Sequence, residues 1–103
     1  MAKLIDAKTT TGVSSAVPRD PSIPTGVLGW GVTSAGAGAA TIAIEVSNDG
    51  TNWVVAGTLS LTLATTVTTT TNTDGFNINA GWKHMRANVT AISGTGAAVT
   101  VDI

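Results

Sequence analysis

The chain has 103 residues, enough for one compact domain, and carries a net charge of −1. Hydrophobic residues make up 43% of it and charged residues only 11%, so threonine, serine and asparagine must supply most of the polar surface. The lack of cysteine excludes disulfides and thiolate sites, the scattered lysines and arginines argue against direct nucleic-acid binding, and no apolar run is long enough to span a membrane.

Residues 1–25 predict an extended N-terminal arm with one short strand. Residues 3–9 have the composition of a strand at a solvated sheet edge, with Leu4 as its apolar side chain. Residues 11–25 contain all three prolines, which lack the N–H that a central strand needs, so we interpret this stretch as a loop or arm. The remainder, residues 26–103, is expected to form a single β-sandwich domain.

The clearest strand lies at residues 39–48. It follows a glycine-thinned strand at residues 26–34, anchored by Val27 and Trp30, and a flexible turn at residues 35–38. Asp49-Gly50 then stands between two alternating runs, which is among the strongest hairpin signals. The alternation places Ile42, Ile44 and Val46 inward and Thr41, Glu45 and Ser47 outward before this turn, and Trp53, Val55, Leu59, Leu61 and Leu63 inward after it.

The C-terminal part of the chain predicts three more strands, at residues 75–79, 83–92 and 97–103, with a turn at residues 93–96. The threonine-rich stretch 64–75 is an edge or a long loop with no definable register. The expected inward side chains are Phe76, Ile78, Met85, Ala87, Val89, Ala91, Val99, Val101 and Ile103, with Thr100 and Asp102 outward.

Seven to eight short strands separated by turn signals predict an all-β protein, an antiparallel β-sandwich or jelly roll. No stretch has the apolar periodicity of a helix, so the crossover helices of a parallel sheet are not expected.

Catalytic chemistry has little support in the sequence. The single histidine, His84, is flanked by Lys83 and Arg86 and has no neighbouring carboxylate to orient it. The six acidic residues form no paired motif. We therefore expect no enzymatic activity and no cofactor.

Two features invite a binding interpretation. The oxygen-rich run from Asn48 to Asn52 offers one carboxylate and two amides, fewer than the six to eight ligands that calcium takes, so a structural turn is favoured over a metal site. The tryptophans either fill the core or stack on a sugar ring. Trp53 shares the inward parity of Val55, which favours the core, whereas Trp82 is expected to be the most exposed of the three.

A surface so poor in charge suits packing against neighbours in an assembly. The residues expected to contact a partner lie on the arm and around the last tryptophan. They are Pro18, Arg19, Pro21, Trp82, Lys83 and Arg86.

The stretch WKHMRANVTAISGTGAAVTV, residues 82–101, follows the hairpin TIAIEVSNDGTNWVVAGTLSL, residues 41–61. These stretches carry a resemblance that covers residues 36–103, to small structural proteins encoded among the virion genes of tailed bacteriophages, which include capsid decoration (cement) proteins and small tail or fibre modules. The run from Ser47 to Trp53 is also similar to a hairpin of discoidin-like and carbohydrate-binding sandwiches.

The resemblance implies a β-sandwich or jelly roll and supplies no catalytic residues. We therefore expect a non-enzymatic virion protein, first of all a capsid decoration protein with the major capsid protein and copies of itself as partners. The alternative is a receptor- or glycan-binding module of a tail or fibre. Because the sequence starts without the apolar segment of a signal peptide, we expect assembly into the virion in the host cytoplasm.

Overall fold

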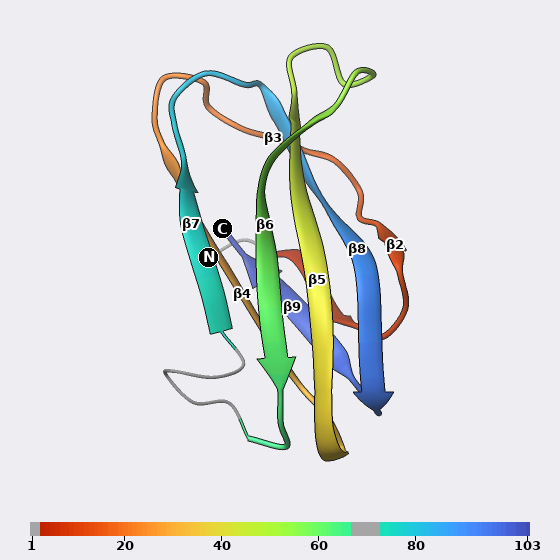
Figure 1. Cartoon of the computed structure of the whole chain (residues 1–103). Helices are drawn as coiled ribbons and strands as arrows, with labels where there is room; N and C mark the ends of the chain where they lie inside the picture. The colour runs from red at the N-terminus through yellow and green to blue at the C-terminus, as the bar shows by residue number, and fades with distance from the viewer. Residues whose placement is uncertain (1–2, 67–72) are drawn as a thin grey trace.

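A computed structural model describes residues 3–66 and 73–103, which form two antiparallel β-sheets packed face to face. Figure 1 shows β6, β5 and β8 of one sheet in front of β4 and β9 of the other. The described residues contain no helix, and hence none long and apolar enough to cross a membrane. The predicted all-β sandwich is confirmed.

Within the described residues, nine strands make up the two sheets, and two of these strands are only two residues long. Sheet A has the order β1-β9-β4-β7, and sheet B has the order β2-β8-β5-β6 with β3 also paired to β8. The strands are β1 (Lys3–Lys8), β2 (Gly12–Val13), β3 (Val17–Pro18), β4 (Thr25–Val32), β5 (Ala35–Ser47), β6 (Val54–Leu63), β7 (Thr73–Ile78), β8 (His84–Thr95) and β9 (Ala98–Asp102).

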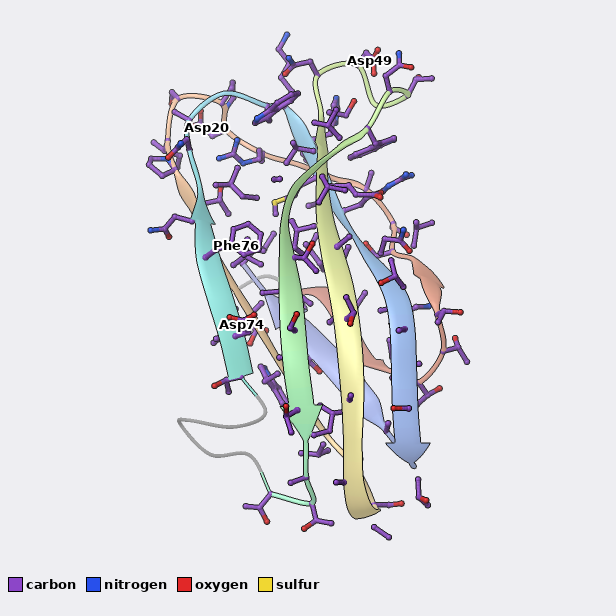
Figure 2. All side chains as sticks on the ribbon, in the orientation of Figure 1. Asp20, Asp49, Asp74 and Phe76 are labelled. Carbon is purple, nitrogen blue, oxygen red and sulfur yellow. The ribbon has the colours of Figure 1, made fainter. Side chains whose placement is uncertain are left out.

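The core between the sheets consists of aliphatic side chains, and glycines of the facing strands make room for the largest of them. A Cβ on Gly29 would lie 2.6 Å from Leu59, and a Cβ on Gly57 would lie 2.6 Å from the Phe76 ring. Figure 2 shows Phe76 of β7 between the sheets beside β6. The inward predictions are confirmed for Ile42, Ile44, Val46, Leu59, Leu61, Leu63, Ile78, Met85, Ala87, Val89, Val99 and Val101, all of which are buried.

The N-terminal segment, residues 3–25, lies along the sandwich and does not project from it. Strand β1 pairs with β9 in sheet A, whereas β2 and β3 pair with β8 in sheet B. Register irregularities in β1 turn two successive side chains, Leu4 and Ile5, into the core. β1 is an edge strand of sheet A with exposed residues, as predicted, but Ile5 joins Leu4 in the core.

Two β-bulges overturn predicted side-chain directions. In β6, Ile44 pairs with Gly57 but Glu45 pairs with Val55, so one residue of β6 is left over. On the N-terminal side of the bulge, a side chain that the alternation predicts to point inward points outward instead. Val55 is accordingly 57% exposed. A similar shift in the β5–β8 pairing, between Thr41 and the next residue, leaves Ala91 exposed.

Other boundaries differ from the sequence interpretation. The expected turn at residues 35–38 is the start of β5, and most of the expected turn at residues 93–96 belongs to β8.

Thr100 and Asp102, which were expected to point outward, are buried. They lie on β9, which is flanked by β1 and β4, and other groups bond to their side chains. The amide of Ala7 donates to Thr100 Oγ1 at 3.0 Å. Of the stretch 64–75, residues 67–72 lie outside the described residues.

Candidate functional site

Three connections meet at one end of the sandwich, and we call this surface the loop end. It consists of residues 19–24, 47–53 and 79–83. Main-chain hydrogen bonds join the three segments, and Figure 2 shows Asp20 and Asp49 at this end. The bonds run from Arg19 N to Lys83 O at 2.8 Å, from Gly81 N to Pro21 O at 2.7 Å and from Lys83 N to Ser47 O at 3.1 Å.

Arg19 holds two of these segments together through its side chain. The Nε group donates to Thr25 Oγ1 at 3.0 Å, and the two terminal nitrogens donate to five main-chain carbonyls. A planar guanidinium is suited to such a task because its N–H groups point in fixed directions. The acceptors are the carbonyls of Ile23, Ile78, Asn79, Gly81 and Trp82. Arg19 is therefore a structural group here, and its donors are already used within the chain.

The segment that Arg19 fixes presents an apolar tip. Asp20 Oδ1 accepts hydrogen bonds from Ser22 N at 2.9 Å and from Ser22 Oγ at 2.6 Å. These bonds, with the Arg19 charge nearby, hold the pKa of Asp20 below its ordinary value. Ile23 follows between two prolines, and 54% of its surface is exposed.

The turn at residues 48–53 closes on itself, as the hairpin prediction requires. Asp49 Oδ1 accepts from Thr51 N and Asn52 N, each at 2.8 Å, and Asp49 Oδ2 accepts from Asn52 Nδ2. Ser47, expected outward, is buried because its Oγ accepts from the amides of Asp49 and Gly50. The bonds from Asn52, then Thr51, hold the pKa of Asp49 far below its ordinary value.

The Asp49 carboxylate is thus occupied by its own turn. Within residues 3–66 and 73–103, no group of three or more histidine, aspartate or glutamate side chains gathers in a way that could hold a metal ion. The structural interpretation of this turn accounts for every bond that the carboxylate accepts.

Arg86 lies beside the loop end, on the outer face of sheet B. Its Nε donates to Glu45 Oε1 at 2.6 Å, and its guanidinium stacks over the Trp53 ring at 4.3 Å from the centroid. Trp53 is therefore half-buried beneath an arginine and does not belong to the core, contrary to the prediction. The bulge in β6 explains the error, since parity counted from Leu59 does not hold beyond it.

The other two tryptophans are also half-buried. Trp82 is partly exposed, as expected, but it packs against the core. Trp30 Nε1 donates to Asp102 Oδ2 at 3.0 Å, and Lys3 Nζ lies 5.6 Å from the Trp30 ring centroid. Lys3 also pairs with Asp102 Oδ1 at 3.7 Å.

The structure brings five of the six expected contact residues together at the loop end or in the strands that adjoin it, and the sixth, Arg86, contacts the loop end only through the Trp53 ring. Pro21 and Lys83 are exposed there, Trp82 is half-buried, and Pro18 pairs with His84 in the adjoining strands. Sequence reasoning missed Ile23, a large apolar side chain of this surface that is 54% exposed. Its position between two prolines, where no strand could bury it, was the available signal.

Comparison of the chain with protein-family models, with curated proteins and with solved structures finds no match.

Proposed function

We propose that the chain is a non-enzymatic structural protein of a bacteriophage particle, namely a capsid decoration protein that binds the assembled shell and stabilises it by its binding free energy. The loop end carries the proposal. Its three segments are tied together by main-chain hydrogen bonds and leave Pro21, Ile23 and Lys83 in contact with solvent. A surface that is fixed before binding loses little conformational entropy when it meets a preformed partner.

The connectivity of the strands also supports a virion role. Successive strands lie in different sheets at every connection except β2–β3 and β5–β6. This winding resembles that of jelly rolls, an architecture used by viral capsid and lectin domains. The likeness is an analogy at the level of the fold, where one architecture serves many functions, so the assignment depends on finding the chain in a particle.

The outer face of sheet B adds a second surface suited to an assembly. Below the Arg86–Trp53 stack, the outward positions of β5, β6 and β8 hold small or polar uncharged side chains. Few charges must be desolvated when such a face is covered. These positions are Ala39, Thr41, Ala43, Thr58, Ser60, Thr62, Asn88, Ala91 and Ser93.

A glycan-binding role receives less support. It requires an aromatic face open to a sugar ring, and each tryptophan is half-buried. Arg86 covers the Trp53 ring, Lys3 lies over Trp30, and Trp82 packs against the core.

Purified particles from cells that carry the gene test the proposal. We expect mass spectrometry to find the chain at a fixed ratio to the major capsid protein, and imaging to place it on the head. Lys83→Glu should lower its occupancy, while Asp6→Lys, a charge reversal at an exposed position of β1, should not. Absence of the chain from particles, or equal occupancy of both variants and the wild type, would refute the proposal.

A further inference from the structure

Strand β6 forms a long edge of sheet B. It pairs with β5 on one side, and no described strand pairs with its other side. A sheet edge of this kind can accept another strand, and proteins protect such edges with charged side chains, prolines, bulges or very short strands. The bulge near the start of β6 leaves residues 57–63 in regular pairing, and β6 contains neither a charged residue nor a proline.

The other edge strands have such protection within themselves. β2 and β3 are two residues long each, and β3 ends in Pro18. Register irregularities interrupt the pairing of β1, and β7, which has six residues, contains the charged Asp74. Among the described strands, β6 is therefore the long edge that lacks a protective side chain of its own.

Asp74 of β7 protects the β6 edge from outside the strand. Its Oδ2 accepts from Ser60 N at 2.9 Å, and its Oδ1 accepts from Gly75 N at 2.9 Å. Asp74 shares the parity of Phe76 and Ile78, which pack in the core, so its carboxylate is directed toward sheet B and meets the edge of β6 (Figure 2). A charged side chain that points inward from an edge strand is a known protection against strand pairing.

The Ser60 amide is the central donor of the exposed edge. Paired residues of an antiparallel ladder alternate between those that bond to each other and those whose N–H and C=O groups point away. Because Ser60 N donates to Asp74, the Thr41–Ser60 pair is of the second kind. Thr58 and Thr62, two residues to either side, therefore also direct their main-chain groups away from β5. Asp74 caps the middle one of these three outward residues.

Without this cap, the β6 edge is complementary to itself. Residues 58–62 read Thr-Leu-Ser-Leu-Thr, which is the same in both directions. In an antiparallel pair of two copies centred on Ser60, each Ser60 faces the other and each Thr58 faces a Thr62. Threonine and serine pairs across strands are favourable, and no charge meets a like charge within the strands. Such a pair has two-fold symmetry and closes as a dimer with one continuous sheet.

We propose that Asp74 is an autoinhibitory cap on β6, which keeps this edge from pairing with β6 of a second copy. In that pair, each Ser60 amide would have to leave its carboxylate. Two Asp74 side chains would also lie close to the two-fold axis, where their like charges repel each other. The cap therefore holds the chain as a monomer, and removal of the carboxylate exposes the edge. The inference does not depend on the proposed role in a virion.

Asp74→Ala tests the cap by sedimentation of the purified chain over a range of concentrations. We expect the variant to dimerise about a hundredfold more tightly than the wild type, roughly tenfold for each of the two charge-assisted hydrogen bonds that no longer have to break. Ser60→Lys added to Asp74→Ala should return the chain to a monomer, since two lysines then face each other. Thr41→Lys is the matched control, because it adds the same charge one strand away from the edge and should leave the dimer in place.

Cysteine pairing tests the register of the dimer, because the natural chain has no cysteine. In the Asp74→Ala background, Ser60→Cys should form an intermolecular disulfide, since the Cα atoms of facing residues lie about 5.5 Å apart. Thr58→Cys should not, because the two copies of residue 58 are four residues apart along the strands, roughly 13 Å. Restoring Asp74 should slow the disulfide at residue 60.

A purely structural Asp74 predicts a different result. Asp74→Ala would then lower the free energy of unfolding and sediment as a monomer, which would overturn the proposal, as would equal rates of oxidation at residues 58 and 60. Asp74→Asn keeps the size of the side chain and provides the same comparisons if Asp74→Ala does not fold. Because a neutral amide caps Ser60 more weakly than a carboxylate, Asp74→Asn should also dimerise more tightly than the wild type, and equal association of the two chains would overturn the proposal as well.

Discussion

The β5–β6 hairpin and the N-terminal segment are both integral to the sandwich, but the bonds that hold them span very different distances along the chain. In the hairpin turn, Asp49 accepts from amides two and three residues ahead. In the N-terminal segment, Arg19 donates to carbonyls 59 to 63 residues away, and β1 pairs with the last strand. The difference teaches that a proline-rich segment without an alternating polar and apolar pattern can still be held in place, provided that residues distant in the sequence supply its hydrogen-bond partners.

The largest expected change in the free energy of unfolding comes from truncating one core isoleucine in each region. The pair of variants tests whether both regions contribute to the core. Ile5 of the N-terminal segment is 7% exposed and Ile42 of the hairpin is fully buried. We expect Ile5→Ala to lower the free energy of unfolding by about 2–4 kcal/mol and Ile42→Ala by about 3–5 kcal/mol, because each leaves a cavity in the core. Urea denaturation of both variants measures the two losses.

A free arm would behave differently. Ile5→Ala would then change the free energy of unfolding by no more than about 0.5 kcal/mol, as exposed substitutions do. The same reasoning changes how an N-terminal truncation must be interpreted. Deleting residues 1–20 removes Leu4 and Ile5 from the core, so a loss of partner binding would report unfolding and not the loss of a tether.

Arg19 distinguishes the two regions more finely, since its bonds to four carbonyls 59 to 63 residues away have no counterpart in the hairpin turn. Arg19→Lys keeps the charge but replaces a planar fork with a single ammonium, which cannot serve five carbonyls and a hydroxyl. We expect a loss of about 2 kcal/mol in the free energy of unfolding, in the range for hydrogen bonds to charged groups. Hydrogen exchange should show faster opening of residues 79–83 with little change in the hairpin turn.

Arg86→Lys is the matched control, because Arg86 has one carboxylate partner and one ring contact on the outer face of sheet B. Arg86→Lys should lower the free energy of unfolding by about 1 kcal/mol or less. Equal losses for the two lysine variants would contradict the assignment of Arg19 as the group that joins the loop-end segments.

The sequence was sufficient for the parts of the fold that depend on local patterns. Alternation identified the inward residues of β5, and Asp-Gly identified the turn that follows. Parity failed where a bulge inserted an extra residue, which is why Val55 and Ala91 point outward. A bulge depends on how two strands pair, so it cannot be recognised from the sequence of one strand alone.

The candidate site was predictable to a smaller extent. The structure places Pro18, Arg19, Pro21, Trp82 and Lys83 near one another because the β3–β4 and β7–β8 connections are bonded to each other, and their contact with a partner stays a prediction. Arg86 was placed with them by nearness in sequence, yet its strand carries it onto the outer face of sheet B. Arg19 was expected to face a partner, because no local pattern reveals that its donors are already used.

Asp49→Asn removes the carboxylate that accepts the short-range bonds of the hairpin turn. We expect it to lower stability less than the other variants, and the pH dependence of the loss should show whether the charge of the carboxylate is responsible. Hydrogen bonds from Asn52 and Thr51 favour the ionised carboxylate in the folded state, so the folded pKa lies below the ordinary value of 3.8. The stabilisation is therefore complete above pH 3.8 and is lost as the pH falls toward the folded pKa. Thermal unfolding should show Asp49→Asn below the wild type at pH 7, with the gap narrowing in acid. Asp6→Asn, at an exposed residue outside the turn, supplies the baseline. A gap that stays constant from neutral to acid pH would mean that the turn depends on the shape of the side chain and not on its charge.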